Sequence, residues 1–348
     1  MYPTRLGGGA HEYQYLYLRT MFPDEATAKC SIALMDATNA FFVRGGPQGS
    51  EGLQYYSTSL AVINNRLRSG EALSDSTLML IVLLVLQEQM RQEMMSARVH
   101  YEGLKKMIEL RGGLGRLENN VPVVLKICKM DVCFALYHGG PISYSRDDKA
   151  TILPKAFSGC TTPILSCNLD SALYGLLLDS IDLSNTLNKG IDCPDYHRLD
   201  LQRTLVSFGC RLLQFQPVGS VYACTKTDAI YHIALLLFTM TLFFQYDGRG
   251  IWRFPLVSQR LQDALTRNIT SKEKESNTLI LWASLMGAIW TMAADEEQWI
   301  VSILREMVHI MKIADFDDML SRLGSLPWVH SIHDGPARSL WNTIRGGS

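Results

Sequence analysis

The segment SARVHYEGLKKMIELRGGLGRLENN, residues 96–120, predicts a helix that ends abruptly at paired glycines. Its apolar residues recur at intervals of three and four, which places them on one face of a helix. On the outer face, Glu102 and Lys106 stand four residues apart, a spacing at which opposite charges can pair. The helix is therefore expected to pack one face against a core and to leave the other in water. The inward residues are Leu104, Met107 and Ile108, with the aliphatic stem of Arg111 beside them.

The glycines after Arg111 predict how this helix ends. Glycine adopts positive φ without the penalty that a Cβ imposes, so Gly112 or Gly113 is expected to take the left-handed conformation. Leu114 can then fold back on the last turn, as in a Schellman ending, while Arg111 places a cation near the negative helix end. A phosphate loop would follow a strand and continue with Gly-Lys-Ser/Thr, and this segment does neither.

Composition places the chain among globular proteins. Of its 348 residues, 47% are apolar and 19% are charged, so a large core can form and wholesale disorder is not expected. The formal net charge is −1 and the pI about 6.7, which argues against a strongly basic nucleic-acid-binding protein. The N-terminal sequence lacks the apolar core of a signal peptide. We expect a soluble intracellular protein.

Helical periodicity dominates the rest of the chain, and alternating strand patterns are few. The predicted fold class is all-α, a single large irregular bundle of roughly 10–13 packed antiparallel helices. Residues 1–22 are expected to form a partly ordered N-terminal segment, and residues 23–345 one helical domain. Within that domain, residues 138–168 are rich in Pro, Gly and Ser and predict a long irregular connection.

Some segments are apolar enough to suggest a membrane span, but they favour buried helices. Residues 78–86, LMLIVLLVL, are too short to cross a bilayer, and Asp75 is expected to cap their helix. Residues 229–244, AIYHIALLLFTMTLFF, carry His232 and predict a core helix. Residues 277–292, NTLILWASLMGAIWTM, are apolar on nearly every side and should form a central helix. We therefore expect no membrane contact.

No pattern for catalysis or metal binding is complete. The eight cysteines include no C-x-x-C pair, as expected for reduced, buried thiols. There is no H-E-x-x-H motif, and the H-x-x-H pair of His330 and His333 lacks a third ligand at a recognisable spacing. We interpret this pair as having a surface or interface role. We predict no catalytic, cofactor-binding or metal-binding residue, and no cofactor.

Several fragments approach catalytic motifs without completing them. HGGP, residues 138–141, is similar to the oxyanion loop of lipases, but no G-x-S-x-G elbow accompanies it, so a helix ending is expected. Terpenoid synthases bind magnesium diphosphate through aspartate-rich helices. DFDDM, residues 315–319, and RDDKA, residues 146–150, are the nearest approaches to that motif. Asp315 is instead expected at a helix start, where acidic residues are favourable.

Two blocks of the sequence together resemble one family. HYEGLKKMIELRGGL, residues 100–114, resembles the hallmark of the fungal-specific transcription factor domain, the regulatory region that usually follows a Zn₂Cys₆ zinc cluster. Residues 279–304 resemble that family's Trp-x-x-x-x-Gly segment and the Glu-x-x-Trp after it, and Trp328 and the Leu340-Trp341 pair follow late in the chain. The resemblance covers nearly the whole chain, residues 12–345.

The resemblance implies an all-helical regulatory domain without enzyme activity, and it assigns structural rather than catalytic positions. The signature residues are His100, Gly103, Leu104, Met107, Ile108, Arg111, Gly112, Gly113, Leu114, Trp282, Gly287, Trp299, Trp328 and Trp341.

The family's DNA-binding module is missing from this chain. A zinc cluster needs two C-x₂-C-x₆-C halves, whereas this sequence has no C-x-x-C, and its first cysteine is Cys30. No direct DNA contact is therefore expected. The resemblance implies partners in the transcription machinery or other regulatory proteins, and a small-molecule effector is a further option. It implies a nuclear location, with the cytoplasm left open.

The preferred hypothesis is a regulatory and interaction domain of a fungal transcriptional regulator that lacks its own Zn₂Cys₆ motif. One alternative is a helical enzyme of terpenoid-synthase type with degraded metal-binding motifs. The other is a stand-alone metabolite-sensing helical domain. Its ligand would be expected beside the central helix, around Trp282, because ligand sites in helical domains tend to lie between helices.

Overall fold

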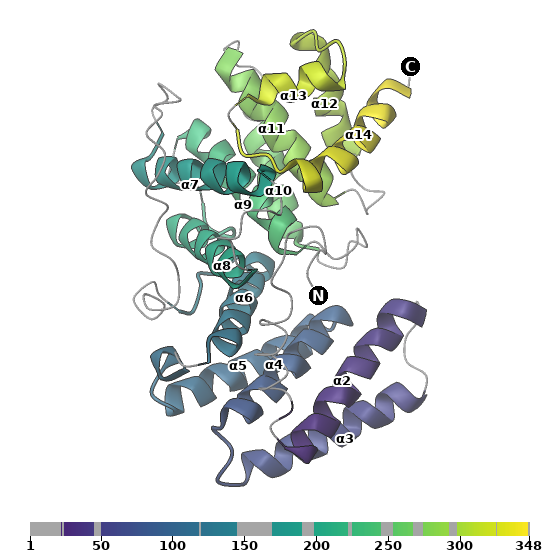
Figure 1. The fold of residues 1–348 in the computed structure, drawn as a ribbon. Coiled ribbons are helices and arrows are strands. Elements are labelled where there is room, and N and C mark those ends of the chain that lie inside the picture. Colours follow the sequence, from purple (N-terminus) through teal and green to yellow (C-terminus); the bar gives the residue numbers. More distant parts are fainter. Residues whose placement is uncertain are drawn as a thin grey trace. The chain divides into compact units, whose positions relative to one another are not determined.

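A computed structural model describes most of the chain as helix. Within the described ranges the chain forms thirteen α-helices, one short 3-10 helix and no strand, which confirms the predicted all-α class (Figure 1). Residues 1–21 of the expected N-terminal segment and residues 145–168 of the expected connection lie outside these ranges. The structure describes residues 22, 24–44, 50–117, 120–144, 169–189, 198–221, 225–244, 253–266, 274–291, 298–324 and 326–346.

The helices group into two compact units, whereas the sequence led us to expect a single bundle. The N-terminal unit contains α2 (Glu25–Arg44), α3 (Ser50–Leu67), α4 (Asp75–Met90), α5 (Met94–Leu110) and the 3-10 helix η1 (Leu114–Leu117). Helix α6 (Val121–His138) begins in this unit and enters the C-terminal unit at Val132. The C-terminal unit also contains α7 (Ser171–Asn188), α8 (Arg198–Phe215), α9 (Lys226–Phe243), α10 (Pro255–Thr266), α11 (Lys274–Thr291), α12 (Gln298–Ile310), α13 (Phe316–Leu323) and α14 (His330–Gly346).

Helix α4 forms the core of the N-terminal unit. It contacts α2, α3 and α5, which explains why its apolar residues are buried on all sides of the helix. Its N-cap is Ser74 rather than the predicted Asp75. The Ser74 hydroxyl accepts a hydrogen bond from the Thr77 N–H at 3.2 Å, so Asp75 becomes the first helical residue. The Asp75 carboxylate is then available to groups from later in the chain.

Helices α9 and α11 form the core of the C-terminal unit. Helix α9 contacts α7, α8, α10 and α11, and every side chain from Asp228 to Phe243 is buried. Helix α11 also contacts α12 and α14, and its Trp282 is fully buried with Nε1 donating to the Pro327 carbonyl at 3.0 Å. Both apolar segments are therefore core helices, as predicted. No helix in the described ranges has the length and apolar character needed to cross a membrane.

The HGGP segment ends α6 as predicted. Gly139 has φ +75° and donates its N–H to the Ala135 carbonyl at 2.8 Å. Its carbonyl accepts the Gly219 N–H at 2.9 Å, and a Cβ built on Gly139 would lie 2.7 Å from the Gly219 Cα. Glycine is therefore needed at position 139 for its backbone conformation and for the close approach of the two chain segments.

Candidate interaction surface on helix α5

The inner face of α5 is built as the sequence predicts. Leu104, Met107 and Ile108 are buried at the expected spacing, and the helix packs along α4 (Figure 1). On the same face, the buried Tyr101 hydroxyl donates to the Asp131 carboxylate of α6 at 2.8 Å. These contacts fix the rotation of α5 about its axis, and with it the residues that α5 presents to solvent.

The end of α5 also forms as predicted. Gly112 and Gly113 have φ values of +98° and +95°, and the Gly113 N–H donates to the Ile108 carbonyl at 2.9 Å, the long bond of a Schellman ending. Leu114 is buried after the turn. Arg111 donates to the Leu73 carbonyl at 2.9 Å and pairs with Asp75. The Arg-Gly-Gly sequence therefore attaches the end of α5 to the start of α4.

The predicted ion pair between Glu102 and Lys106 is wrong. Glu102 pairs instead with Lys105 at 2.7 Å, and Lys106 pairs with Glu109 at 3.0 Å. Lys105 is half-buried, and its ammonium lies 5.4 Å from the centre of the Tyr101 ring, which draws it toward the inner face. Both of these ion pairs on α5 therefore join residues three apart rather than four.

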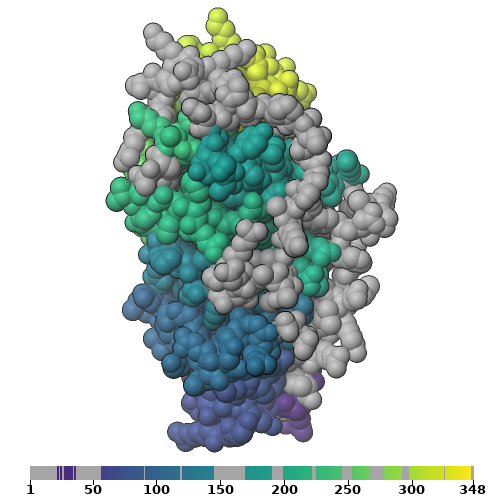
Figure 2. Space-filling model, turned by 90° about the vertical axis from the view of Figure 1, so that its left-hand side faces the viewer, coloured from purple at the N-terminus to yellow at the C-terminus, as the bar shows by residue number. Residues whose placement is uncertain are grey.

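The outer face of α5 carries an uncovered apolar stripe. Met95, Val99 and Leu110 are 73%, 69% and 66% exposed, and Gly103 lies among them with no atom within 4 Å of a Cβ built on it. At 100° per residue, these four positions fall within about 80° of one another around the helix, and the exposed Lys106 falls among them. The blue part of the chain, which includes α5 and its neighbours in sequence, reaches the surface in the space-filling view (Figure 2). We did not predict this surface, although the positions of Met95, Val99 and Leu110 in the sequence place them together, away from the inner face of the helix.

The signature residue His100 lies beside this stripe but turns toward a polar cluster. It is half-buried, and burial lowers its pKa, partly offset by the nearby Glu88 carboxylate. Glu88 is itself buried and pairs with Arg91 at 3.4 Å. Burial, followed by a hydrogen bond to Glu88, raises the pKa of Tyr56. The cluster joins α3, α4 and α5 through their side chains.

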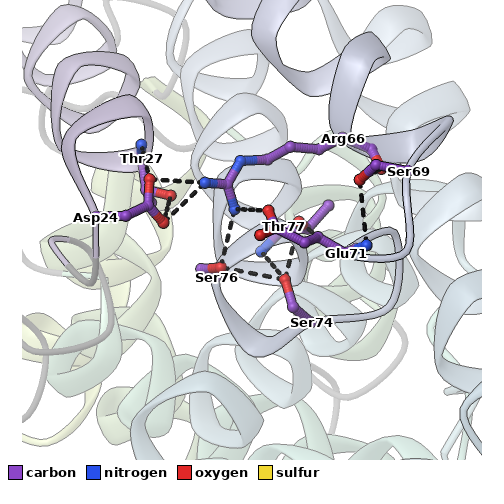
Figure 3. Close-up of polar contacts among 8 residues, drawn as sticks. All are labelled: Asp24, Thr27, Arg66, Ser69, Glu71, Ser74, Ser76 and Thr77. Carbon is purple, nitrogen blue, oxygen red and sulfur yellow. Dashed lines mark hydrogen bonds and ion pairs between the residues drawn. The ribbon is translucent and has the colours of Figure 1, made fainter.

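A second polar network lies where α3 ends (Figure 3). The buried Arg66 guanidinium donates to both Asp24 oxygens at 2.7 Å and to the Ser76 hydroxyl at 3.1 Å, and it pairs with Glu71 at 3.3 Å. Asp24 also accepts the Thr27 N–H at 2.8 Å, which caps α2. Burial opposes ionisation of Asp24, but these hydrogen bonds outweigh it and lower its pKa to about 2. Arg66 therefore ties α3 to the starts of α2 and α4.

The predicted surface role for both His330 and His333 is wrong for His333. His330 is exposed, but His333 is fully buried in the C-terminal unit. Its Nδ1 accepts the Val329 N–H at 2.9 Å, and its Nε2 lies 2.9 Å from the Thr241 hydroxyl. His333 is the fourth residue of α14, and its burial places it on the inner face of that helix. Both ring nitrogens are used in packing, which leaves no H-x-x-H metal pair.

Two of the three aspartates of residues 315–319 bond backbone N–H groups at the start of α13. Asp315 is the N-cap of α13 and accepts the Asp318 N–H at 2.8 Å. Asp318 accepts the Ala314 N–H at 2.9 Å and pairs with Arg322 at 3.0 Å. Among the described residues, no group of three or more His, Cys, Asp or Glu side chains could hold a metal ion. The second aspartate-rich fragment, residues 146–150, lies outside the described ranges.

The second signature block supplies packing in the C-terminal unit. A Cβ on Gly287 would overlap Leu261 of α10 and lie 2.8 Å from Ile300 Cδ1 of α12, so glycine allows three helices to meet. Trp328 Nε1 donates to Asp334 at 2.7 Å, and the Trp341 ring lies beneath the Arg345 guanidinium at 4.9 Å. Trp282, Trp328 and Trp341 are buried, and Trp299 is half-buried. The structure therefore uses these positions in the core.

Comparison with known proteins identifies no relative of this chain. No protein-family model matches it, and neither the curated proteins nor the solved structures contain a significant match.

Proposed function

We propose that this chain is a regulatory and interaction domain of a transcriptional regulator and that it works in the nucleus through protein contacts. The observation that carries the proposal is the exposed apolar face of Met95, Val99 and Leu110 on α5. Covering one such side chain with a partner contributes about 1.5–3 kcal/mol. Exposed apolar side chains that gather on one face of a helix are typical of interaction sites. The face lies on the helix that carries the signature block, residues 100–114, and the family resemblance supplies the link to transcription.

Several polar groups in the described ranges serve the fold. The carboxylates of Asp24, Asp315 and Asp318 are engaged by backbone N–H groups at helix starts, and Trp282 donates its N–H to a backbone carbonyl in the core. Groups held in this way maintain the fold. A catalytic acid, base or ligand must instead face a substrate.

A reporter assay tests this function. The full chain is fused to a heterologous DNA-binding module, and reporter output is compared with that of the module alone. We expect the fusion to change output in one direction and a Val99→Asp, Leu110→Asp variant to lose that effect. Val221→Asp, at another exposed apolar position, is the matched control and should keep it. Output equal to that of the module alone would overturn the proposal.

The alternative enzyme activity has its own test. A terpenoid synthase consumes prenyl diphosphate in a magnesium-dependent reaction. We expect the purified full chain to release no more product from prenyl diphosphates with magnesium than a heat-denatured sample does. Robust turnover that requires magnesium would replace the interaction role with catalysis.

A further inference from the structure

We infer that the exposed face of α5 binds the same face of a second copy of this chain, with the two helices antiparallel about a two-fold axis beside Gly103. The inference rests on the proposed function, because it names the partner of the surface described there. Three features of α5 support it: a row of charges, the spacing of the apolar residues and the glycine itself.

The charges on one flank of the stripe are self-complementary. Arg98, Glu102, Lys105 and Glu109 alternate in sign and fall within about 60° of one another around the helix. In an antiparallel pair related by a two-fold axis, the charged flank of one helix faces the same charged flank of the other helix. With the axis level with the midpoint between residues 103 and 104, Arg98 is level with Glu109 of the second copy. Glu102 is then level with the half-buried Lys105 of the second copy, so residues of opposite charge are level at all four positions.

The apolar residues fit the same axis. Leu110 of one copy falls at a level between Met95 and Val99 of the other, within about 3 Å along the axis of each, given a rise of about 1.5 Å per residue. A leucine placed between two side chains of the facing helix is the arrangement by which helices interdigitate. The charge row and the apolar residues therefore specify one register.

Gly103 is the third feature. A glycine inside a helix costs about 0.5–1 kcal/mol relative to alanine. Among the described residues no contact requires it, because the space for a Cβ is open and Gly103 does not belong to the glycines with positive φ. Beside the proposed axis, the missing side chain lets two backbones approach closely, since the distance between packed helices depends on the side chains at the contact.

The dimer is expected to be weak and reversible. One helix pair forms an interface at the small end of specific protein contacts. The charge pairs stay partly exposed and are screened by salt, so they set register and selectivity more than affinity. Association should therefore decrease as salt concentration increases.

Charge-reversal variants test the pairing of Arg98 with Glu109. In sedimentation velocity at low salt, the wild-type chain should associate as its concentration rises to about 1 mM. Arg98→Glu alone and Glu109→Arg alone place like charges opposite each other, so each variant should shift toward monomer. An equimolar mixture of the two variants restores both pairs and should associate again. A wild-type chain that stays monomeric, or a mixture no more associated than either variant, would overturn the inference.

Gly103→Ala separates association from folding. The added methyl enters open space among the described residues, so it should raise the midpoint of chemical unfolding while it weakens association. Unchanged association in Gly103→Ala would contradict the axis position. If the reporter fusion is active while the isolated chain remains monomeric, the proposed function stands and the second copy is the wrong partner. If the chain dimerises without any reporter effect, the dimer stands and the role in transcription is wrong.

Discussion

His232 and His333 are fully buried in the C-terminal unit, and both rings bond neutral groups. His232 Nε2 bonds the Leu212 carbonyl at 3.0 Å. Because His333 Nδ1 accepts a backbone N–H, the ring proton must lie on Nε2, from which it reaches Thr241. Burial lowers the pKa of His232 to about 4 and that of His333 to about 3. Both rings therefore remain neutral in the folded protein at physiological pH.

These pKa values predict loss of stability in mild acid. The unfolded chain binds protons on both histidines below a pKa of about 6.5, whereas the folded chain does not, so the free energy of unfolding falls as pH falls. Each histidine contributes a slope of up to about 1.4 kcal/mol per pH unit. Urea unfolding at several pH values between about pH 7 and about pH 5 measures this dependence of the unfolding free energy on pH. His333→Gln should reduce the slope, and the exposed His309→Gln should not; equal slopes in all three proteins would contradict this account.

Lys312 adopts a left-handed backbone conformation just after the end of α12. It has φ +52°, and the Ile313 N–H after it donates to the Val308 carbonyl at 3.0 Å, as in a Schellman ending. A side chain in this conformation carries a penalty that glycine avoids. Lys312→Gly should stabilise the protein by about 0.5–1 kcal/mol in urea unfolding. Lys312→Ala keeps the Cβ and should gain little, so an equal gain in both variants would exclude backbone strain as the cause.

At the scale of elements, two glycines inside helices have opposite surroundings. Gly287 lies in α11 where α10 and α12 approach, whereas Gly103 lies on the open side of α5. The sequence alone gives both as signature glycines within helical segments. Only the neighbouring helices distinguish a glycine that allows close packing from one that leaves a surface bare.

Alanine at these two glycines should therefore have opposite effects. Gly287→Ala forces its methyl into Leu261 and should cost about 1–3 kcal/mol, the usual range for overpacking. Gly103→Ala fills open space in a helix and should gain about 0.5–1 kcal/mol. Chemical denaturation of the two variants beside the wild type measures both changes. A stabilising Gly287→Ala would show that α10 and α12 do not pack as described.

At the scale of the whole molecule, the chain folds as two compact units that α6 connects. Each unit has its own central helices, α4 in one and the α9–α11 pair in the other. Because most packing lies within a unit, a change in one core should affect that unit first.

Amide hydrogen exchange tests this division. Arg66→Met removes the network that joins α3 to the starts of α2 and α4, so it should speed exchange in the N-terminal unit while α9 and α11 keep their protection. Gly287→Ala should produce the reverse pattern. Faster exchange through both units in either variant would mean that they unfold as one.

The candidate surface was predictable only in part from the sequence. Periodicity placed Leu104, Met107 and Ile108 on the inner face of α5, and local backbone rules placed positive φ at the glycines after Arg111. The partners of Arg111 were not predictable, because Leu73 and Asp75 lie distant in sequence and meet it only after α4 and α5 pack.

The sequence by itself determined the all-α class, the apolar core helices and the glycine-capped end of α5, because these depend on spacing within one or two helical turns. The tertiary structure alone decided the division into two units, the burial of His333 and the exposure of Met95, Val99 and Leu110. The reason is physical: an apolar side chain is buried or exposed according to whether another helix covers it. Periodicity gives the face of a helix, and only packing gives the neighbour of that face.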